Sequence, residues 1–220
     1  MAVRALLLDF DGTMVDTESV DWRSWEEVFA QHGVELPRER FLLRIGTLNG
    51  PDELDELDAL LESPVDRDAV QAGRRAREHE LIAEEPLRPG VDRLLEEAAE
   101  LGLKVAIVSS STRDWVHSHL ERLAIDHHVV LVHCADGDRD RCKPSPVLYL
   151  EALDHLGVRA DEAIALEDST NGVAAAKAAG IFTVAFPNPV TSGSDLSAAD
   201  LLVHSLEEVP LRSLLERAAA

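Results

Sequence analysis

The chain has 220 residues, and its 42 Asp and Glu residues against 21 Lys and Arg residues give a formal net charge of −21 at pH 7. Lys and Arg carry most of the affinity for phosphate backbones and for anionic membrane surfaces, so this balance argues against nucleic-acid and membrane-surface partners. A hydrophobic share of 45% is ordinary for a globular protein and excludes an acidic disordered chain.

The first residues and the cysteines bear on where the protein works. The apolar run before Asp9 is too short for a secretory signal, and no stretch approaches the 18 apolar residues of a membrane span. Two cysteines are too few for a disulfide framework in a chain of this length. We therefore expect a cytoplasmic protein without a membrane partner, and nothing in the sequence indicates its oligomeric state.

Short runs that are apolar almost throughout recur along the chain and predict strands buried on both faces, as in a parallel sheet. These runs span residues 3–8, 104–109, 129–133, 163–166 and 182–186. Helical periodicity follows between them at 91–101, 147–156 and 172–179, and each of these segments ends at a glycine. Such alternation predicts an α/β fold with a doubly wound parallel sheet of Rossmann-like type.

One section breaks the alternation, because residues 16–85 show helical periodicity and no convincing strand. Three helices are expected there, one carrying Trp22, Trp25 and Phe29 and the others near 54–61 and 70–82. We expect the aromatic residues to form the core of a small domain. The predicted organisation is an all-helical cap at 16–86, inserted into an α/β core made of residues 1–15 and 87–220.

The segment that is most informative about chemistry runs from Asp9 to Thr13, with the sequence Asp-Phe-Asp-Gly-Thr, at the end of the first predicted strand. In open α/β sheets ligands bind beyond the carboxyl ends of the strands. Asp9 and Asp11 are two positions apart and share one face, where their mutual repulsion favours a divalent cation or a shared proton. A simple Asp-Gly turn is the alternative.

Polar residues also lie at the ends of other predicted strands and helices, which argues against a simple Asp-Gly turn. Ser109 ends the second predicted strand, Lys143 precedes a predicted helix, and Glu167 and Asp168 follow the fourth predicted strand. Oxygen ligands from Asp9, Asp168 and a backbone carbonyl suit Mg²⁺. A lysine and hydroxyl groups suit a phosphate dianion.

These four motifs, in this order and at these spacings, resemble the haloacid dehalogenase-like superfamily of hydrolases, in its branch with a helical cap of the beta-phosphoglucomutase and phosphatase kind. The resemblance implies that Asp9 is the nucleophile that forms an aspartyl-phosphate and that Asp11 is the general acid and base. It implies that Mg²⁺ is held by Asp9, the Asp11 backbone carbonyl and Asp168, with Glu167 as a ligand or a support. Ser109 and Lys143 would bind the phosphoryl oxygens.

The resemblance also reduces the number of reactions that this chain is expected to catalyse. Dehalogenases lack the second aspartate of the first motif, and phosphonatases need a cap lysine, whereas this chain has Asp11 and no lysine from 16 to 85. Sugar-phosphate mutases carry a cap histidine where this chain has Asp21. We therefore expect a phosphatase acting on a small phosphorylated metabolite, a sugar phosphate or similar phosphomonoester. A mutase of the beta-phosphoglucomutase type and a catalytically silent phosphate-binding module stay open as alternatives.

Three cap residues are candidates for substrate selection. Arg44 and Thr47 lie in a loop between predicted cap helices, where related enzymes place substrate-selecting groups. Arg74 belongs to an arginine-rich stretch of the third predicted cap helix, which a solvated helix face would also explain.

Overall fold

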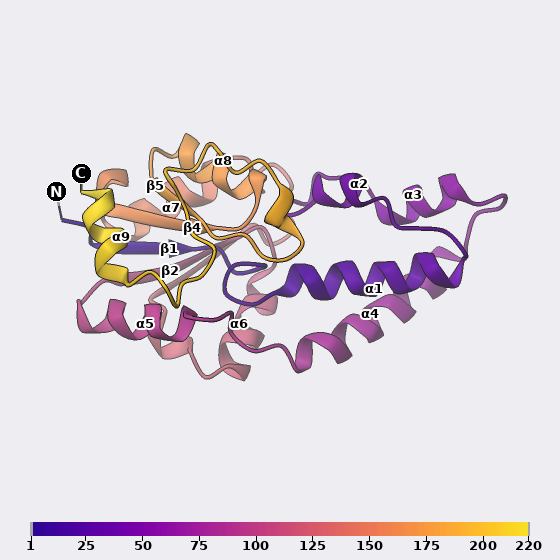
Figure 1. Cartoon of the computed structure of the whole chain (residues 1–220), viewed down its shortest axis with the longest axis horizontal. Coiled ribbons are helices and arrows are strands. Elements are labelled where there is room, and N and C mark those ends of the chain that lie inside the picture. The colour runs from indigo at the N-terminus through magenta and orange to yellow at the C-terminus, as the bar shows by residue number, and fades with distance from the viewer. Residues whose placement is uncertain (1, 220) are drawn as a thin grey trace.

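A computed structural model describes residues 2–219 and contains one six-stranded sheet in which all neighbouring strands are parallel. The strand order is β3-β2-β1-β4-β5-β6, so β1 lies near the middle (Figure 1). The strands are β1 (Ala5–Leu8), β2 (Lys104–Ser109), β3 (Leu131–Cys134), β4 (Ala163–Glu167), β5 (Phe182–Ala185) and β6 (Leu201–Leu202). The doubly wound parallel sheet predicted from the sequence is confirmed. β6 was not predicted, because two residues are too few to produce a pattern.

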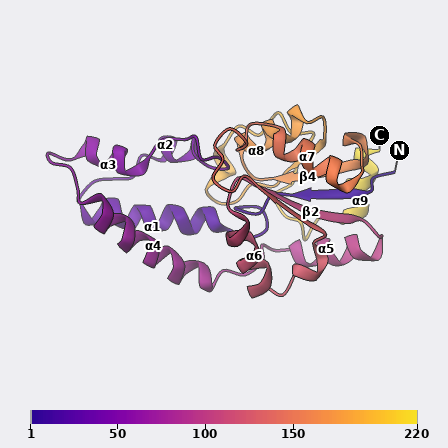
Figure 2. The same ribbon diagram turned by 180° about the vertical axis from the view of Figure 1, so that it is seen from behind.

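Helices cover both faces of the sheet, and the alternation of side chains along the strands explains how (Figures 1 and 2). In β1, Leu6 and Leu8 pack with α5, α6 and α9, whereas Ala5 and Leu7 pack with α7 and α8 on the opposite face. These helices are α5 (Val91–Glu100), α6 (Arg113–Arg122), α7 (Val147–Leu156), α8 (Thr170–Ala178) and α9 (Leu211–Ala218). Within residues 2–219, three short 3₁₀ turns also occur, at Asp126–His128, Ala160–Glu162 and Thr191–Gly193.

The three predicted core helices are present, but α6 and α9 were not predicted. α6 is mostly charged and polar, and it buries only Val116, His119 and Leu120. Such a sparse apolar stripe gives only a weak helical pattern in the sequence. Packing against the sheet, rather than the local sequence pattern, therefore stabilises this helix.

Four helices form a narrower lobe that extends beyond the carboxyl ends of the strands (Figure 1). They are α1 (Thr17–Gln31), α2 (Arg38–Leu42), α3 (Glu53–Leu60) and α4 (Arg67–Ala83). Trp25, Phe29, Phe41 and Leu57 are buried at its centre, so the expectation of an aromatic core is confirmed. The sequence predicted three helices, and α2 was missed because its five residues complete too few turns to show a period.

The two connections between this lobe and the sheet run side by side. Val15 and Leu87 form an isolated antiparallel bridge, and the Arg88 N–H donates to the Met14 carbonyl at 2.8 Å. This paired crossing lies where the sequence places the domain boundaries, and we propose on that basis that 16–86 is a cap domain on a core of 1–15 and 87–220.

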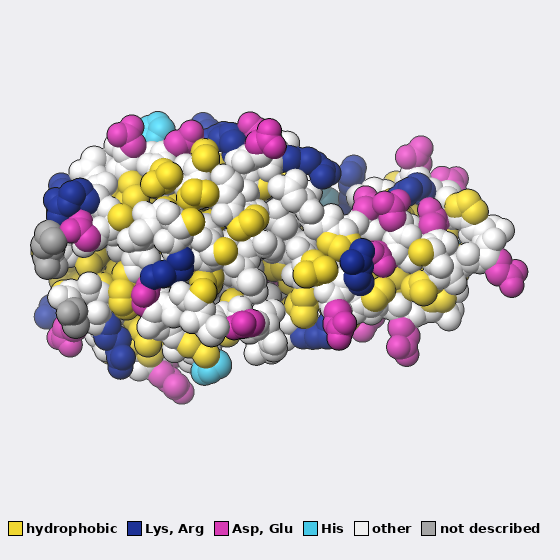
Figure 3. Space-filling model, turned by 90° about the horizontal axis from the view of Figure 1, so that it is seen from above, with side chains coloured by type: hydrophobic (Ala, Val, Ile, Leu, Met, Phe, Trp, Pro, Cys, Tyr) yellow, Lys and Arg dark blue, Asp and Glu magenta, His cyan; other side chains and the backbone are white. Residues whose placement is uncertain are grey.

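The surface carries many acidic groups. On the face drawn in Figure 3, Lys and Arg side chains stand in small groups beside Asp and Glu side chains over both lobes. Within residues 2–219, no helix is both long enough and apolar enough to cross a membrane.

The sheet core can be tested at Leu7, whose side chain is completely buried in the central strand. We expect Leu7→Ala to lower the free energy of unfolding by about 2–5 kcal/mol, because it removes buried methyl groups and leaves a cavity. Leu150→Ala is the matched control, because Leu150 on α7 is 48% exposed, and its effect should stay within roughly 0.5 kcal/mol. Urea denaturation measures both, and equal losses would contradict this packing.

Candidate active site

Parallel pairing brings the predicted site residues to one edge of the sheet. Leu8 of β1 is aligned with Ile107 of β2 and with Leu166 of β4, so the residues that follow these positions meet. The Asp9 N–H donates to the Leu166 carbonyl at 3.0 Å and fixes Asp9 beside Glu167. The structure thus gathers the six residues predicted for the core site: Asp9, Asp11, Ser109, Lys143, Glu167 and Asp168.

Lys143 lies at the centre of this group and its side chain is fully buried. Its Nζ lies 2.5 Å from Oδ1 of Asp9 and 2.6 Å from Oε1 of Glu167. Burial disfavours the ammonium form, but the two carboxylates outweigh it and raise the pKa of Lys143 above its ordinary value. The site therefore holds one permanent positive charge between two acidic residues.

Asp9, Glu167 and Asp168 form a compact group of buried carboxyl groups, with one oxygen from each lying within 4.8 Å of the others. Burial, opposed by Lys143 and reinforced by Glu167 and Asp11, raises the pKa of Asp9 to about 8. Burial and the neighbouring Asp9 also raise the pKa of Asp168 well above its usual range. Oxygen-only donors with excess negative charge fit a divalent cation such as Mg²⁺.

Glu167 has two different environments at its two carboxyl oxygens. Oε1 contacts Lys143 and accepts a hydrogen bond from the Tyr149 hydroxyl at 2.5 Å. Oε2 is buried and has no hydrogen-bond partner within the described part of the chain. The first oxygen positions Lys143, and the second packs against Gly172, where a Cβ built on the backbone would lie 1.7 Å from it.

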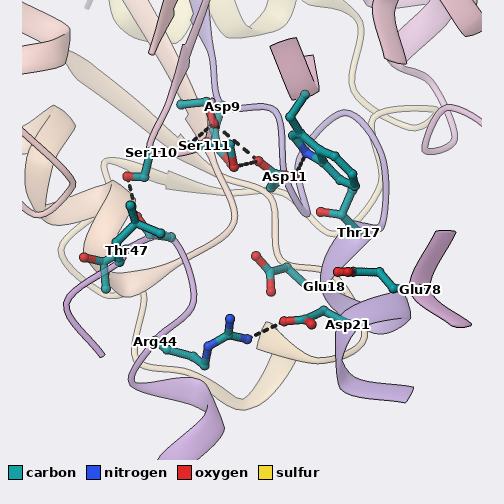
Figure 4. A pocket seen from close by; sticks show the side chains of 14 residues that line it. Asp9, Asp11, Thr17, Glu18, Asp21, Arg44, Thr47, Glu78, Ser110 and Ser111 are labelled. Carbon is teal, nitrogen blue, oxygen red and sulfur yellow. Dashed lines mark hydrogen bonds and ion pairs between the residues drawn. The ribbon is translucent and has the colours of Figure 1, made fainter. Parts of the chain in front are cut away.

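Asp11 is held by three donors, one each from the end of β2, the turn after it and α6. Its Oδ2 accepts from Ser111 Oγ at 2.6 Å and from Ser109 Oγ at 3.3 Å. Its Oδ1 accepts from Trp115 Nε1 at 2.8 Å, and Figure 4 shows these contacts at one side of the pocket. Sequence reasoning missed Ser111 and Trp115, although the run of three serines at the end of β2 was a visible signal.

A second set of contacts, also missed from the sequence, holds Asp168. Asn188 Nδ2 donates to Asp168 Oδ2 at 2.6 Å, while Asn188 Oδ1 accepts the N–H groups of Val190 and Thr191 at 2.9 and 3.0 Å. Gly12 packs against the same carboxylate. Its φ of +75° and a distance of 2.2 Å from a Cβ built there to Asp168 Oδ2 leave room for glycine only.

Arg88 connects these loops from the start of the second core segment. Its guanidinium donates to the carbonyls of Gly12 at 2.5 Å, Phe186 at 2.9 Å and Pro187 at 2.7 Å. It also stacks on the Phe186 ring, with Cζ 3.6 Å from the ring centroid. Arg88 therefore fixes the loop after β1 relative to the loop that carries Asn188.

A cavity of about 270 Å³ separates this core site from the helical lobe. Arg44 and Thr47 line it, as expected of residues that meet a substrate, and so do Asp9 and Asp11 (Figure 4). Arg74 is placed differently. It is buried behind the cavity wall, where it contacts Asp21 at 2.7 Å and Glu78 at 3.0 Å.

The loop that contains Arg44 also contacts the core directly. Ser110 Oγ donates to the Gly46 carbonyl at 2.8 Å, and Asn171 Nδ2 donates to the Ile45 carbonyl at 2.8 Å. The cavity therefore lies between the two lobes and is lined by residues of both, rather than being a groove on one of them.

Comparison with known proteins agrees with this architecture, since residues 6–186 match the haloacid dehalogenase-like hydrolase family. The chain belongs to this family. It is 36% identical over 214 residues to the putative phosphatase YhcW of Bacillus subtilis (strain 168), with 97% of each chain covered. The family membership confirms the expectation of an enzyme of hydrolase type.

Solved structures of the family superpose over almost the whole chain. CbbY from Rhodobacter sphaeroides in complex with phosphate gives a TM-score of 0.75 at 29% identity, covering 97% of this chain and 99% of that one. A putative beta-phosphoglucomutase from Thermotoga maritima gives 0.76 at 27% identity, covering 97% and 99%. Both structures thus match this chain over the sheet and the helical lobe.

Asn188 offers a test of the support around Asp168. Asn188→Ala removes the acceptor for two buried N–H groups and the donor to Asp168, so we expect it to lower the free energy of unfolding by about 1–3 kcal/mol or more. Asn49→Ala is the control, since the exposed Asn49 amide makes one bond to the Arg139 carbonyl, and its effect should be below about 1 kcal/mol. Chemical denaturation compares the two, and a neutral Asn188→Ala would contradict the contacts described.

Proposed function

We propose that this enzyme hydrolyses a small phosphomonoester, a sugar phosphate or a similar metabolite, in a Mg²⁺-dependent reaction through an aspartyl-phosphate on Asp9. The observation that carries the proposal is the environment of the Asp9 carboxyl group. It contacts the buried ammonium of Lys143 at 2.5 Å, belongs to the carboxylate group with Asp168, and opens onto the cavity that Asp11 also lines.

Each step of the proposed reaction uses a residue already in place. An Asp9 oxygen attacks phosphorus, the bond from phosphorus to the leaving oxygen breaks, and Asp11 gives that oxygen a proton. Asp11 then takes a proton from a water molecule that attacks the aspartyl-phosphate, which releases inorganic phosphate and restores Asp9. Ser109 and Lys143 bind the phosphoryl oxygens, and Lys143 also stabilises Asp9 as the carboxylate that the attack requires.

The cation site is proposed at Asp9, the Asp11 backbone carbonyl and Asp168. The closeness of the Asp9, Glu167 and Asp168 carboxyl groups and the raised pKa values of Asp9 and Asp168 support it, since they indicate negative charge without enough compensation. Bound Mg²⁺ would supply charge neutralisation for the phosphoryl group. The contacts of Glu167 with Lys143 and Tyr149 favour a supporting role for this residue.

The volume of the cavity limits the size of the substrate. About 270 Å³ between two lobes accommodates a small metabolite and not a macromolecule. Arg44 and Thr47 are proposed to contact the leaving group, and Arg74 is proposed to act on selection through Asp21. A cytoplasmic location stays a prediction from the sequence.

The two alternatives receive less support. Asp21 occupies the position of the mutase cap histidine, and it is paired with Arg44 and Arg74, so it is not available as the acid and base of a phosphoryl transfer between sugar positions. A silent phosphate-binding module would not need Asp11 held beside Asp9 by three donors. Formation of inorganic phosphate rather than an isomerised sugar phosphate separates hydrolysis from mutase activity.

The role of Asp9 is tested by Asp9→Asn, which we expect to lower kcat for release of phosphate by at least about 10⁴-fold, since the nucleophile is lost. The variant should also fail to retain labelled phosphate after acid quenching. Asp114→Asn, a change of the same kind at an exposed position on α6, should behave as the unchanged protein. Wild-type turnover in Asp9→Asn would rule out the nucleophile.

The cation site is tested without turnover. We expect millimolar Mg²⁺ to raise the unfolding temperature of the unchanged protein, because a cation that binds only the folded state stabilises it. The rise should disappear in Asp168→Asn and after addition of a chelator, and it should return with excess Mg²⁺. Calorimetry measures it, and an equal rise in Asp168→Asn would place the cation elsewhere.

A further inference from the structure

Three of the described residues that line the cavity from the helical lobe carry carboxyl groups. Glu18 and Asp21 reach it from α1 and Glu78 reaches it from α4, whereas Arg44 is the one Lys or Arg side chain that lines it among the described residues (Figure 4). The phosphate-binding groups lie at the opposite end, around Asp9 and Ser109. The helical lobe therefore presents carboxyl groups, rather than phosphate-binding groups, to the leaving group of a substrate.

The positive charge of Arg44 is already neutralised. Its guanidinium contacts Asp21, and its Nε lies 2.6 Å from Glu53. The buried Arg74 behind it is likewise paired with Asp21 and Glu78. The guanidinium groups of Arg44 and Arg74 are thus paired with three carboxyl groups, and Glu18 is a fourth carboxyl group nearby. A second anionic group on a substrate would have to displace Asp21 or Glu53 from Arg44 in order to bind it.

Glu18 is the lobe residue whose surroundings indicate a contact with the substrate. It is 8% exposed, its side chain lines the cavity, and no hydrogen bond or ion pair to its carboxyl group occurs among residues 2–219. Figure 4 shows this group projecting into the open space between the core site and Arg44. Burial, and next the charges of Asp21 and Asp11, raise its pKa well above the usual range, as expected for a carboxyl group without a donor.

A donor from the substrate would satisfy this group. A hydroxyl group supplies a hydrogen bond, and an ammonium group supplies both a hydrogen bond and the positive charge that the four carboxyl groups lack. A phosphate or carboxylate at this end supplies neither and adds repulsion.

We propose that the lobe side of the cavity selects a phosphomonoester whose leaving group carries an ammonium group, accepts a polyhydroxylated one less well, and rejects one with a second anionic group. The inference rests on the proposed phosphatase function and names its substrate class. Glu18 is the contact for the donor, and Asp21 keeps Arg44 from acting as an anion site.

The test compares kcat/KM for matched phosphates that differ in one group. Glucosamine 6-phosphate against glucose 6-phosphate, and ethanolamine phosphate against ethylene glycol phosphate, exchange ammonium for hydroxyl. Glucose 1,6-bisphosphate and 6-phosphogluconate add an anion. We expect at least one ammonium compound to exceed its hydroxyl partner by about tenfold or more, as a charge-assisted hydrogen bond does, and both anionic compounds to fall below glucose 6-phosphate.

Two variants and one control variant show which residues cause the preference for an ammonium group. Glu18→Gln should bring the ratio of ammonium to hydroxyl compound close to one, whereas Glu26→Gln, which removes the same charge from an exposed position of α1, should keep it. Asp21→Asn should raise the relative kcat/KM of the bisphosphate, because Arg44 loses one of its partners. Circular dichroism checks that the variants are folded, and the Asp21→Asn result remains informative if Glu18→Gln does not fold.

The outcomes separate the two proposals. Release of phosphate without any preference for ammonium, or with the bisphosphate as the best compound, overturns the inference and leaves the phosphatase function standing. An ammonium preference that Glu18→Gln retains in full overturns the assignment to Glu18. Absence of phosphate release from every compound overturns both proposals.

Discussion

The contact on which the site depends is the buried ammonium of Lys143 between Asp9 and Glu167, at 2.5 and 2.6 Å. Removing one member of a buried ion pair leaves an uncompensated charge and costs about 3–5 kcal/mol. Asp9 is therefore fixed from one side by a charge that cannot move away, because Glu167 and Tyr149 hold the lysine in turn. This arrangement orients the Asp9 carboxylate before any substrate arrives, and preorganisation of that kind is what lowers the barrier of a phosphoryl transfer.

One ammonium is not enough for the acidic groups around it. Asp9 and Asp168 remain under-compensated, and their burial keeps water from screening them. A net charge of −21 would by itself repel an anionic substrate. Under the proposed function, the same excess of carboxyl groups would hold a divalent cation at one point of the site, and the cation together with Lys143 would reverse the local sign of charge for a phosphate dianion.

The sequence was sufficient to predict that six residues meet at one edge of the sheet, because each follows a strand or precedes a helix, where local periodicity is strong: Asp9, Asp11, Ser109, Lys143, Glu167 and Asp168. Asn188, Arg88 and Trp115 could not be found in this way. Their roles depend on contacts with residues 20, 76 and 104 positions away, which only the folded chain brings together. α2 and β6 were missed for the related reason that tertiary packing, not a repeated local pattern, determines such short elements.

Division of the cavity between two lobes lets chemistry and selection vary separately. Asp9, Lys143 and Asp168 belong to the sheet edge and are held by Tyr149 and Asn188, none of which comes from the helical lobe. Glu18, Asp21 and Arg44 belong to the lobe, where Asp21 binds both Arg44 and Arg74. A substitution at Asp21 changes the charge presented to the leaving group while every contact of Lys143 stays intact. A histidine at this position would remove the carboxyl group that pairs with both arginines. Under the proposed function, the identity of this one side chain would set the charge of the acceptable leaving group without changing the contacts of Asp9.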